Sequence, residues 1–175
     1  MRNNTGRLTA LALTVSFALI LSFIESKLPP FVPIQGVKIG LANITVIFAL
    51  YKLGICEAAA ISAVRVVLVS LLFGNPMSFL YSIAGAVLSL AAMYVLKRFT
   101  PLTVVTVSIV GGIMHNVGQI GMASILLGTN AVVYYLPILI ISGMLAGIAV
   151  GIASGLVIKK VNIDLSYVHK NKKQK

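Results

Sequence analysis

The chain has 175 residues and a formal net charge of +11, and 59% of its residues are hydrophobic while only 10% are charged. A water-soluble domain of this size carries about a quarter charged residues, so the composition excludes an ordinary soluble globule and predicts a membrane protein. The basic residues lie at the chain ends and between apolar runs instead of along one amphipathic face, which argues against nucleic-acid binding. Cys56 is the single cysteine, so an internal disulfide is excluded.

The apolar runs predict an all-α protein with six membrane-spanning helices, because a span needs about 20 mostly apolar residues and must satisfy its backbone hydrogen bonds internally. The first run has the basic start of a signal peptide. It ends in Glu25-Ser26-Lys27 rather than in a small-residue cleavage site, so we interpret it as a retained helix. The predicted spans are Leu8–Ile24, Val37–Tyr51, Ile55–Phe73, Pro76–Leu96, Leu102–Leu127 and Val132–Ile158.

The distribution of Lys and Arg predicts that both termini lie in the cytoplasm. In this orientation eleven of the 14 basic residues are on the inner side, Lys27 and Lys38 are on the outer side, and Arg65 lies inside a span. We therefore expect one six-helix domain over residues 1–160 in the cell membrane. A basic cytoplasmic tail over residues 161–175 follows it and lies near anionic lipid.

The connection between the first two spans, Glu25–Asn43, crowds charges, prolines and glycines together away from the chain ends. It reads E-S-K-L-P-P-F-V-P-I-Q-G-V-K-I-G-L-A-N. We expect this connection to help form a ligand site at the outer face of the bundle.

Arg65 lies near the middle of a span, where a charge costs about 2.5–3.5 kcal/mol and normally faces the bundle interior or a water-filled cavity. Three interpretations are open: the guanidinium pairs with a carboxylate, binds backbone carbonyls, or contacts an anionic ligand. Carboxylates are scarce, because Glu25 is expected at the outer rim and Glu57 at the cytoplasmic end of the span. Their scarcity favours the last two interpretations.

The fifth span carries His115, Asn116 and Gln119 near its centre, and Gly111 and Gly112 are expected to leave room beside them. His115 and Gln119 are one turn apart and share a face. They are either satisfied core residues or hydrogen-bond partners of a ligand. A metal site is not expected, because the only other histidine is His169 in the tail.

The remaining polar residues complete one hypothesis, in which side chains from several helices converge on an outer cavity that suits a small polar or anionic ligand. Ser82 lies on a serine-lined side of the fourth span, where hydroxyls can also bond to their own helix. We predict no catalytic residue, metal or cofactor. The predicted ligand-binding residues are Lys27, Lys38, Asn43, Arg65, Ser82, His115, Asn116 and Gln119.

Two helices carry small residues at four-residue spacing, which lets a neighbouring backbone approach closely. Each ridge serves either packing inside the bundle or docking of a partner subunit, and the first helix is the better candidate for docking. The ridges are Ala10, Thr14, Ala18 and Ser22 in the first span, and Gly143, Gly147, Gly151 and Gly155 in the sixth.

Three pieces of sequence together match a known family: P-I-Q-G-V-K-I-G-L-A-N, S-I-A-G-A-V-L-S-L-A-A-M and H-N-V-G-Q, with Arg65 between the first two. With them the chain resembles the Gx transporter family, also labelled heptaprenyl diphosphate synthase component I, over nearly all residues up to about Lys160. That family is similar to the substrate-binding S components of energy-coupling factor transporters.

This resemblance implies a six-helix bundle with cytoplasmic termini and a ligand site near the outer face, closed by the loop after the first helix. It also implies docking onto a membrane coupling protein that two ATPases drive. S components use an Ala-x-x-x-Ala ridge on the first helix for that contact, and here the matching positions read Ala10, Thr14 and Ala18.

Two functions are open. The chain is either a substrate-binding component of transporter type, or a membrane accessory subunit that works with electron-transfer subunits in isoprenoid, quinone or flavin-linked extracellular electron transfer. A passive channel fits less well, because no ring of like residues recurs among the helices. Prenyl chain elongation needs acidic clusters to hold Mg²⁺, and Asp164 is the single aspartate, so we do not expect an enzyme.

Overall fold

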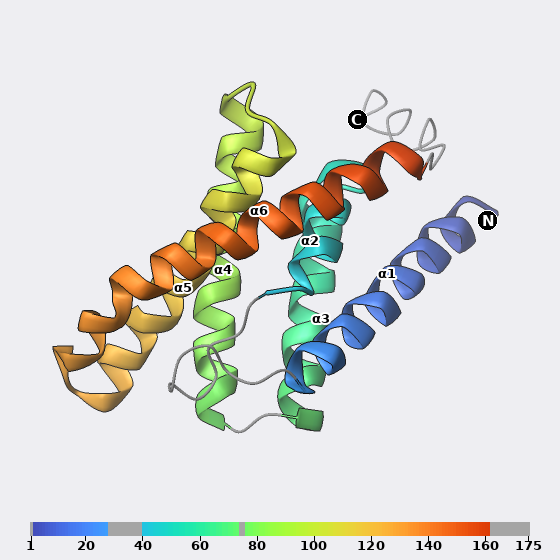
Figure 1. Ribbon diagram of the computed structural model, residues 1–175. Helices are drawn as coiled ribbons and strands as arrows, with labels where there is room; N and C mark the ends of the chain where they lie inside the picture. Colours follow the sequence, from blue (N-terminus) through green and yellow to red (C-terminus); the bar gives the residue numbers. More distant parts are fainter. Residues whose placement is uncertain (1, 28–39, 74–75, 162–175) are drawn as a thin grey trace.

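The computed structural model describes residues 2–27, 40–73 and 76–161, and these residues form helices without strands. Lys38 and residues 162–175 of the predicted tail lie outside the described residues. Figure 1 shows the arrangement. The elements are α1 (Arg2–Lys27), α2 (Asn43–Lys52), α3 (Ile55–Phe73), α4 (Pro76–Phe99), α5 (Val104–Leu127), the 3₁₀ helix η1 (Asn130–Tyr135) and α6 (Leu136–Lys160).

Five of the described helices are long and apolar enough to cross a membrane, which indicates a multi-pass membrane protein. The second predicted span differs. Where a helix over Val37–Tyr51 was expected, α2 begins at Asn43 and has 10 residues. Ten residues of α-helix rise about 15 Å, half of the hydrocarbon thickness of about 30 Å. The described part of α2 therefore does not cross a bilayer by itself.

The start of the sixth predicted span also differs. Asn130–Tyr135 forms a separate 3₁₀ helix, and α6 begins only at Leu136. Pro137 then lies in the first turn of α6, where a missing N–H costs nothing because the first amides of a helix have no partner within it. The proline starts the helix instead of bending it.

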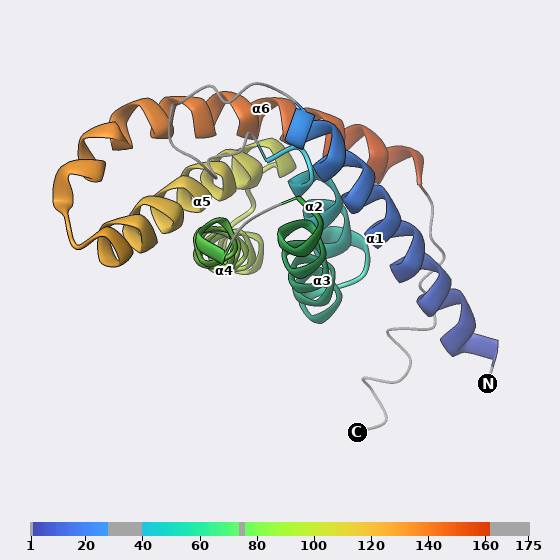
Figure 2. The same cartoon turned by 90° about the horizontal axis from the view of Figure 1, so that it is seen from below.

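With the short helix α2 included, successive helices run alternately up and down, so that the first residues of α1 and the last residues of α6 lie at the same end of the bundle (Figure 1). Seen from below, α1, α2 and α3 lie on one side and α4 and α5 on the other, with α6 arching across them (Figure 2). The predicted cytoplasmic location of this end remains an expectation from the charges.

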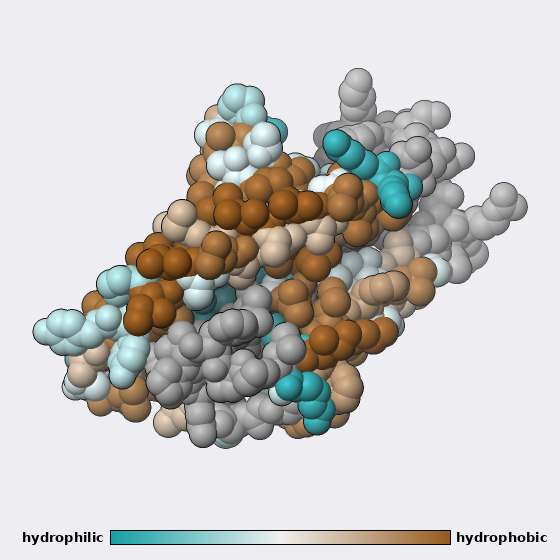
Figure 3. All heavy atoms as spheres, viewed as in Figure 1, coloured by the Kyte–Doolittle hydropathy of each residue, from teal (hydrophilic) through white to brown (hydrophobic). Residues whose placement is uncertain are grey.

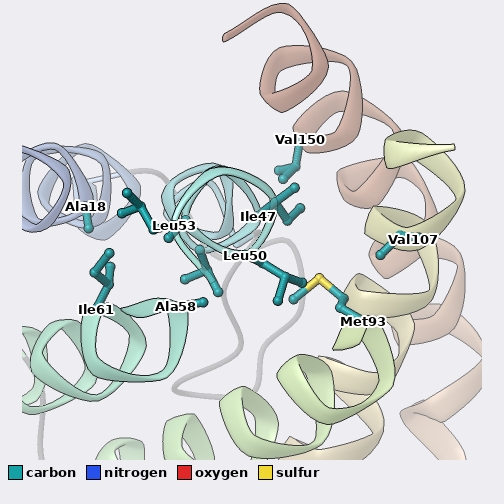
Figure 4. Close-up of a cluster of buried hydrophobic side chains, with 11 residues drawn as sticks. Ala18, Ile47, Leu50, Leu53, Ala58, Ile61, Met93, Val107 and Val150 are labelled. Carbon is teal, nitrogen blue, oxygen red and sulfur yellow. The ribbon is translucent and has the colours of Figure 1, made fainter. Parts of the chain in front are cut away.

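The core of the bundle surrounds α2. Six consecutive residues of this helix, Thr45–Leu50, are buried, so α2 is covered on all sides. Each of the five longer helices contributes at least one buried side chain to the hydrophobic cluster around α2 (Figure 4). These side chains are Ala18 of α1, Ala58 and Ile61 of α3, Met93 of α4, Val107 of α5 and Val150 of α6.

Charged side chains from neighbouring helices meet both ends of α2. At its end, the Lys97 ammonium of α4 donates to the Leu50 carbonyl and lies 4.8 Å from the ring centroid of Tyr51. Before its start, the Gly40 N–H donates to the Glu25 carboxylate of α1. A helix favours negative charge at its N-terminus and positive charge at its C-terminus, so both contacts stabilise α2 in its buried position.

The glycines of α6 pack against α5. A Cβ atom built on Gly143 would lie 2.9 Å from the Gly112 carbonyl oxygen, and one on Gly147 would lie 2.6 Å from Cα of Ile109. Asn116 uses the same contact, because its side-chain amide donates to the Leu139 carbonyl of α6 over 2.6 Å. The glycine ridge therefore serves packing within the bundle through Gly151, whereas a Cβ on Gly155 would meet nothing within 4 Å.

The small-residue ridge of α1 also faces inward. Thr14, Ala18 and Ser22 are buried, while Phe17 on the opposite face is 61% exposed. Large apolar side chains likewise cover the outside of α6, and the brown surface in Figure 3 follows both helices. An outer surface of this kind suits lipid rather than water. In this structure neither ridge is displayed to a partner.

Leucine at Gly143 is expected to separate α5 from α6, because its side chain has no space beside the Gly112 carbonyl. Overpacking of this kind costs about 1–3 kcal/mol. Thermal unfolding in detergent, followed by size-exclusion chromatography, measures the loss. Gly155→Leu is the matched control on the same helix, and equal melting temperatures for the two variants would contradict the assigned packing.

Replacement of Asn116 by alanine is expected to lower the stability by about 1 kcal/mol, because the variant loses an interhelical hydrogen bond within the bundle. Chemical denaturation in mixed micelles is the appropriate measurement. Ser16→Ala provides the comparison, since the Ser16 hydroxyl is exposed and bonds only locally to the Ala12 carbonyl. An Asn116→Ala protein as stable as Ser16→Ala would show that the bond contributes nothing.

Candidate ligand site

A small polar cavity lies among α1, α3, α4, α5 and the residue Gly40 that precedes α2. Its volume of about 30 Å³ is enough for one or two water molecules. The lining residues have polar side chains except Gly40, Val66 and Val69. The lining residues are Ser22, Glu25, Gly40, Arg65, Val66, Val69, Ser70, Ser82, His115 and Gln119.

Arg65 reaches the cavity from the buried face of α3. Ile61, Ser62, Arg65, Val66 and Val69 are all buried, and their spacing of three and four residues identifies one side of the helix. Only 7% of Arg65 is exposed. A guanidinium in such a position needs an anion or several acceptors, because isolated burial of a charge is strongly unfavourable.

Glu25 is the acidic group near Arg65. It lies in the last turn of α1, on the inward face that Ser22 and Ala18 share, and 7% of it is exposed. An attractive electrostatic interaction joins it to Arg65. The sequence-based expectation put Glu25 at the outer rim and therefore favoured carbonyls or a ligand for Arg65. The structure brings this carboxylate into the cavity and supports the interpretation with a carboxylate partner.

Gly40 links Glu25 to the start of α2. Its N–H donates to Glu25 Oε1, and its carbonyl accepts from the Asn43 N–H over 2.9 Å. The backbone at Gly40 has φ = +88°, a conformation that side chains with a Cβ rarely adopt. The glycine thus lets the chain present its amide to the carboxylate immediately before the helix begins.

His115 and Gln119 reach the cavity from α5 at the point where it crosses α4. A Cβ atom on Gly85 of α4 would lie 3.0 Å from His115 Cε1 and 3.0 Å from Gln119 Cγ. Gly85 therefore makes the space for these two side chains. Gly111 and Gly112 were expected to do so, but they pack against Met93 and Gly143 instead.

The structure brings four of the predicted ligand-binding residues to one cavity: Arg65, Ser82, His115 and Gln119. Asn116 is directed to α6, where it bonds to the Leu139 carbonyl. The named ligand-binding residues did not include Ser22, Glu25, Gly40 and Ser70, although Glu25 and Gly40 belong to the connection Glu25–Asn43 that was expected to help form the site. The inward spacing of Thr14, Ala18, Ser22 and Glu25 on α1 was the available signal for two of them.

Two further predicted residues lie outside the cavity lining. Asn43 is half-buried beside Gly40, where its amide nitrogen would lie 3.0 Å from a Cβ at that glycine. Lys27 is exposed, and its ammonium lies 5.4 Å from the ring centroid of Phe23.

The chemistry of the cavity is that of hydrogen bonding and charge recognition. It combines a guanidinium, a carboxylate, an imidazole, an amide, serine hydroxyls and a backbone N–H. Such a set can hold a polar ligand that has oxygen acceptors, in surroundings where each bond is stronger than in water.

Comparison with known proteins gives one match. A family model described as heptaprenyl diphosphate synthase component I matches residues 14–157. The match includes the six helices, apart from the first residues of α1 and the last of α6, and every described residue of the cavity lining. Neither the curated proteins nor the solved structures give a match. The chain belongs to the heptaprenyl diphosphate synthase component I family.

Proposed function

We propose that this protein is a substrate-binding component of transporter type in the cell membrane, which captures a small polar or anionic ligand from the outer face. The observation that carries the proposal is the buried polar cavity around Arg65 in a bundle with an apolar outer surface. Charged groups within a membrane domain are costly, and they typically mark a ligand or ion pathway. A purely structural bundle gains little from such a group.

The proposed side of entry rests on charge. Lys52, Lys97 and Lys160 are in the last turns of α2, α4 and α6. These helices finish at the end of the bundle where α1 starts (Figure 1), and an excess of Lys and Arg marks a cytoplasmic side. Glu25, Gly40 and Ser70 lie toward the opposite end. On this basis the cavity faces the outside of the cell, and the ligand enters it from that side.

The proposed role is binding rather than catalysis. The chain has three acidic residues and no phosphate-binding Walker sequence, so energy for transport has to come from partner subunits or a gradient. In the S-component interpretation the partners are a membrane coupling protein and ATPases. Since both small-residue ridges are buried, docking through the α1 ridge would require α1 to move.

The second candidate is a membrane accessory subunit, either of a prenyl diphosphate synthase, with which the family description is compatible, or of an electron-transfer assembly. The word component implies a partner. In such a complex the acidic, Mg²⁺-holding site belongs to another subunit, because diphosphate chemistry requires several carboxylates. Here the bundle holds a lipid or a redox carrier and does not move a solute.

Native mass spectrometry of the full-length protein, released gently from membranes, tests the first candidate. We expect a bound polar or anionic small molecule, together with coupling and ATPase subunits. Gln119→Ala and Arg65→Ala are expected to reduce ligand retention about tenfold or more, because each removes a hydrogen-bonding group from the cavity. Asn116→Ala is the matched control, since its partner is in α6.

If the protein is instead an accessory subunit, native mass spectrometry should detect different bound molecules. Prenyl lipid, a chromophore or synthase subunits bound to the wild-type protein, with retention unchanged in Gln119→Ala, would contradict the transporter assignment. Gln119→Ala keeps the comparison interpretable if Arg65→Ala does not fold, because it leaves Glu25 and Arg65 together.

A further inference from the structure

The cavity is too small for the ligand that the proposed function requires. Its volume of about 30 Å³ compares with about 300–1,000 Å³ for typical small-molecule sites. The groups that would recognise an anion are nevertheless assembled. They are the Arg65 guanidinium, the Gly40 N–H and the N-terminal end of α2.

A protein carboxylate already occupies these groups. Glu25 accepts the Gly40 N–H and attracts Arg65, and both charged side chains are 7% exposed. The Glu25 carboxylate thus makes the contacts that a carboxylate or phosphate group of a ligand would make. The charges of Arg65 and Glu25 therefore offset each other without a ligand.

We propose that Glu25 is an internal substitute for an anionic group of the ligand, and that a ligand bearing such a group binds by displacing Glu25 from Arg65 and from the Gly40 N–H. This inference rests on the proposed function only in treating the cavity as a ligand site. It identifies the ligand class as small molecules with an anionic oxygen group.

The place of Glu25 in α1 makes displacement feasible. It lies in the last turn of the helix, where a negative side chain opposes the helix dipole. The next two residues, Ser26 and Lys27, are exposed. A rotation of the side chain toward them takes the carboxylate from the interior to the surface, so its burial depends on the contacts with Arg65 and Gly40.

Displacement also couples binding to a change of shape. The Glu25–Gly40 hydrogen bond joins the end of α1 to the start of α2. A competing anion that takes over this amide breaks the hydrogen bond between the end of α1 and the start of α2, and the cavity then gains the volume that the carboxylate occupied. The ligand favours the open state because it makes these contacts only when Glu25 has left.

Chemical rescue of Glu25→Ala in the full-length purified protein tests this proposal. The variant leaves Arg65 without its buried carboxylate, and we expect its melting temperature to fall. Acetate and inorganic phosphate, each compared with chloride at equal ionic strength, are the probes. At least one of them should raise the melting temperature of Glu25→Ala by about 3 °C more than chloride does.

Two controls make the result specific. Glu57→Ala removes another buried carboxylate, 8% exposed, at the opposite end of α3, and should show no selective rescue. The double variant Glu25→Ala/Arg65→Ala removes the cation and should also show none. If Glu25→Ala does not survive purification in chloride, Glu25→Gln takes its place, with the same expectation of stronger stabilisation by anions than the wild-type protein shows.

The outcomes separate the possibilities. Rescue by acetate alone assigns a carboxylate ligand, and rescue by phosphate alone assigns a phosphate ligand. Equal responses to both probes and to chloride, rescue of Glu57→Ala, or rescue that persists in the double variant would overturn the proposal. Selective rescue in a protein whose wild type retains no ligand in native mass spectrometry would uphold the anion site and reject the capture role.

Discussion

The structure depends on holding a short helix inside a membrane bundle. α2 is buried all round, and its ends cannot reach water on both sides as those of a spanning helix do. Charged side chains from two other helices provide hydrogen-bond partners at the two ends of α2. The Glu25 carboxylate of α1 accepts an amide before the start of α2, and the Lys97 ammonium of α4 donates to a carbonyl at its end. Their signs match the helix dipole. The other helices can then pack their apolar side chains around α2.

The cavity follows from the same arrangement. Because α2 begins part-way along α3 (Figure 1), Gly40 before its start lines the same cavity as Arg65 of α3 and His115 and Gln119 of α5. A full-length spanning helix would fill this space with apolar side chains. The carboxylate that stabilises the start of α2 is also the anion near Arg65, so one residue serves both the fold and the site. A change at Glu25 therefore affects both.

Composition and the positions of apolar runs were sufficient to predict a helical membrane protein and five of its long helices. They did not reveal that α2 is short, because Val37–Tyr51 is apolar enough for a span and only the position of the turn at Gly40 limits the helix. Arg65, Ser82, His115 and Gln119 were found because polar residues stand out against apolar ones. Glu25 was not named as a ligand-binding residue because its place at the end of the apolar run suggested the outer rim, although its spacing from Ala18 and Ser22 puts it on the same face of α1. Asn116 shares a helix turn with His115, and only the packing of α6 distinguishes their roles.

The glycines of the second half of the chain have a mechanical consequence. α5 meets α4 at Gly85 and Gly118 and meets α6 at Gly112 and Gly143, with backbone against backbone. Contacts between main chains have no side-chain rotamers that could absorb a displacement, so sliding one helix past another would break them all together. We therefore expect α4, α5 and α6 to move together as one rigid unit. A movement that admits a ligand is more easily made by α1, which packs on the bundle through the side chains Thr14, Ala18 and Ser22 and is joined to the start of α2 by the Glu25–Gly40 hydrogen bond.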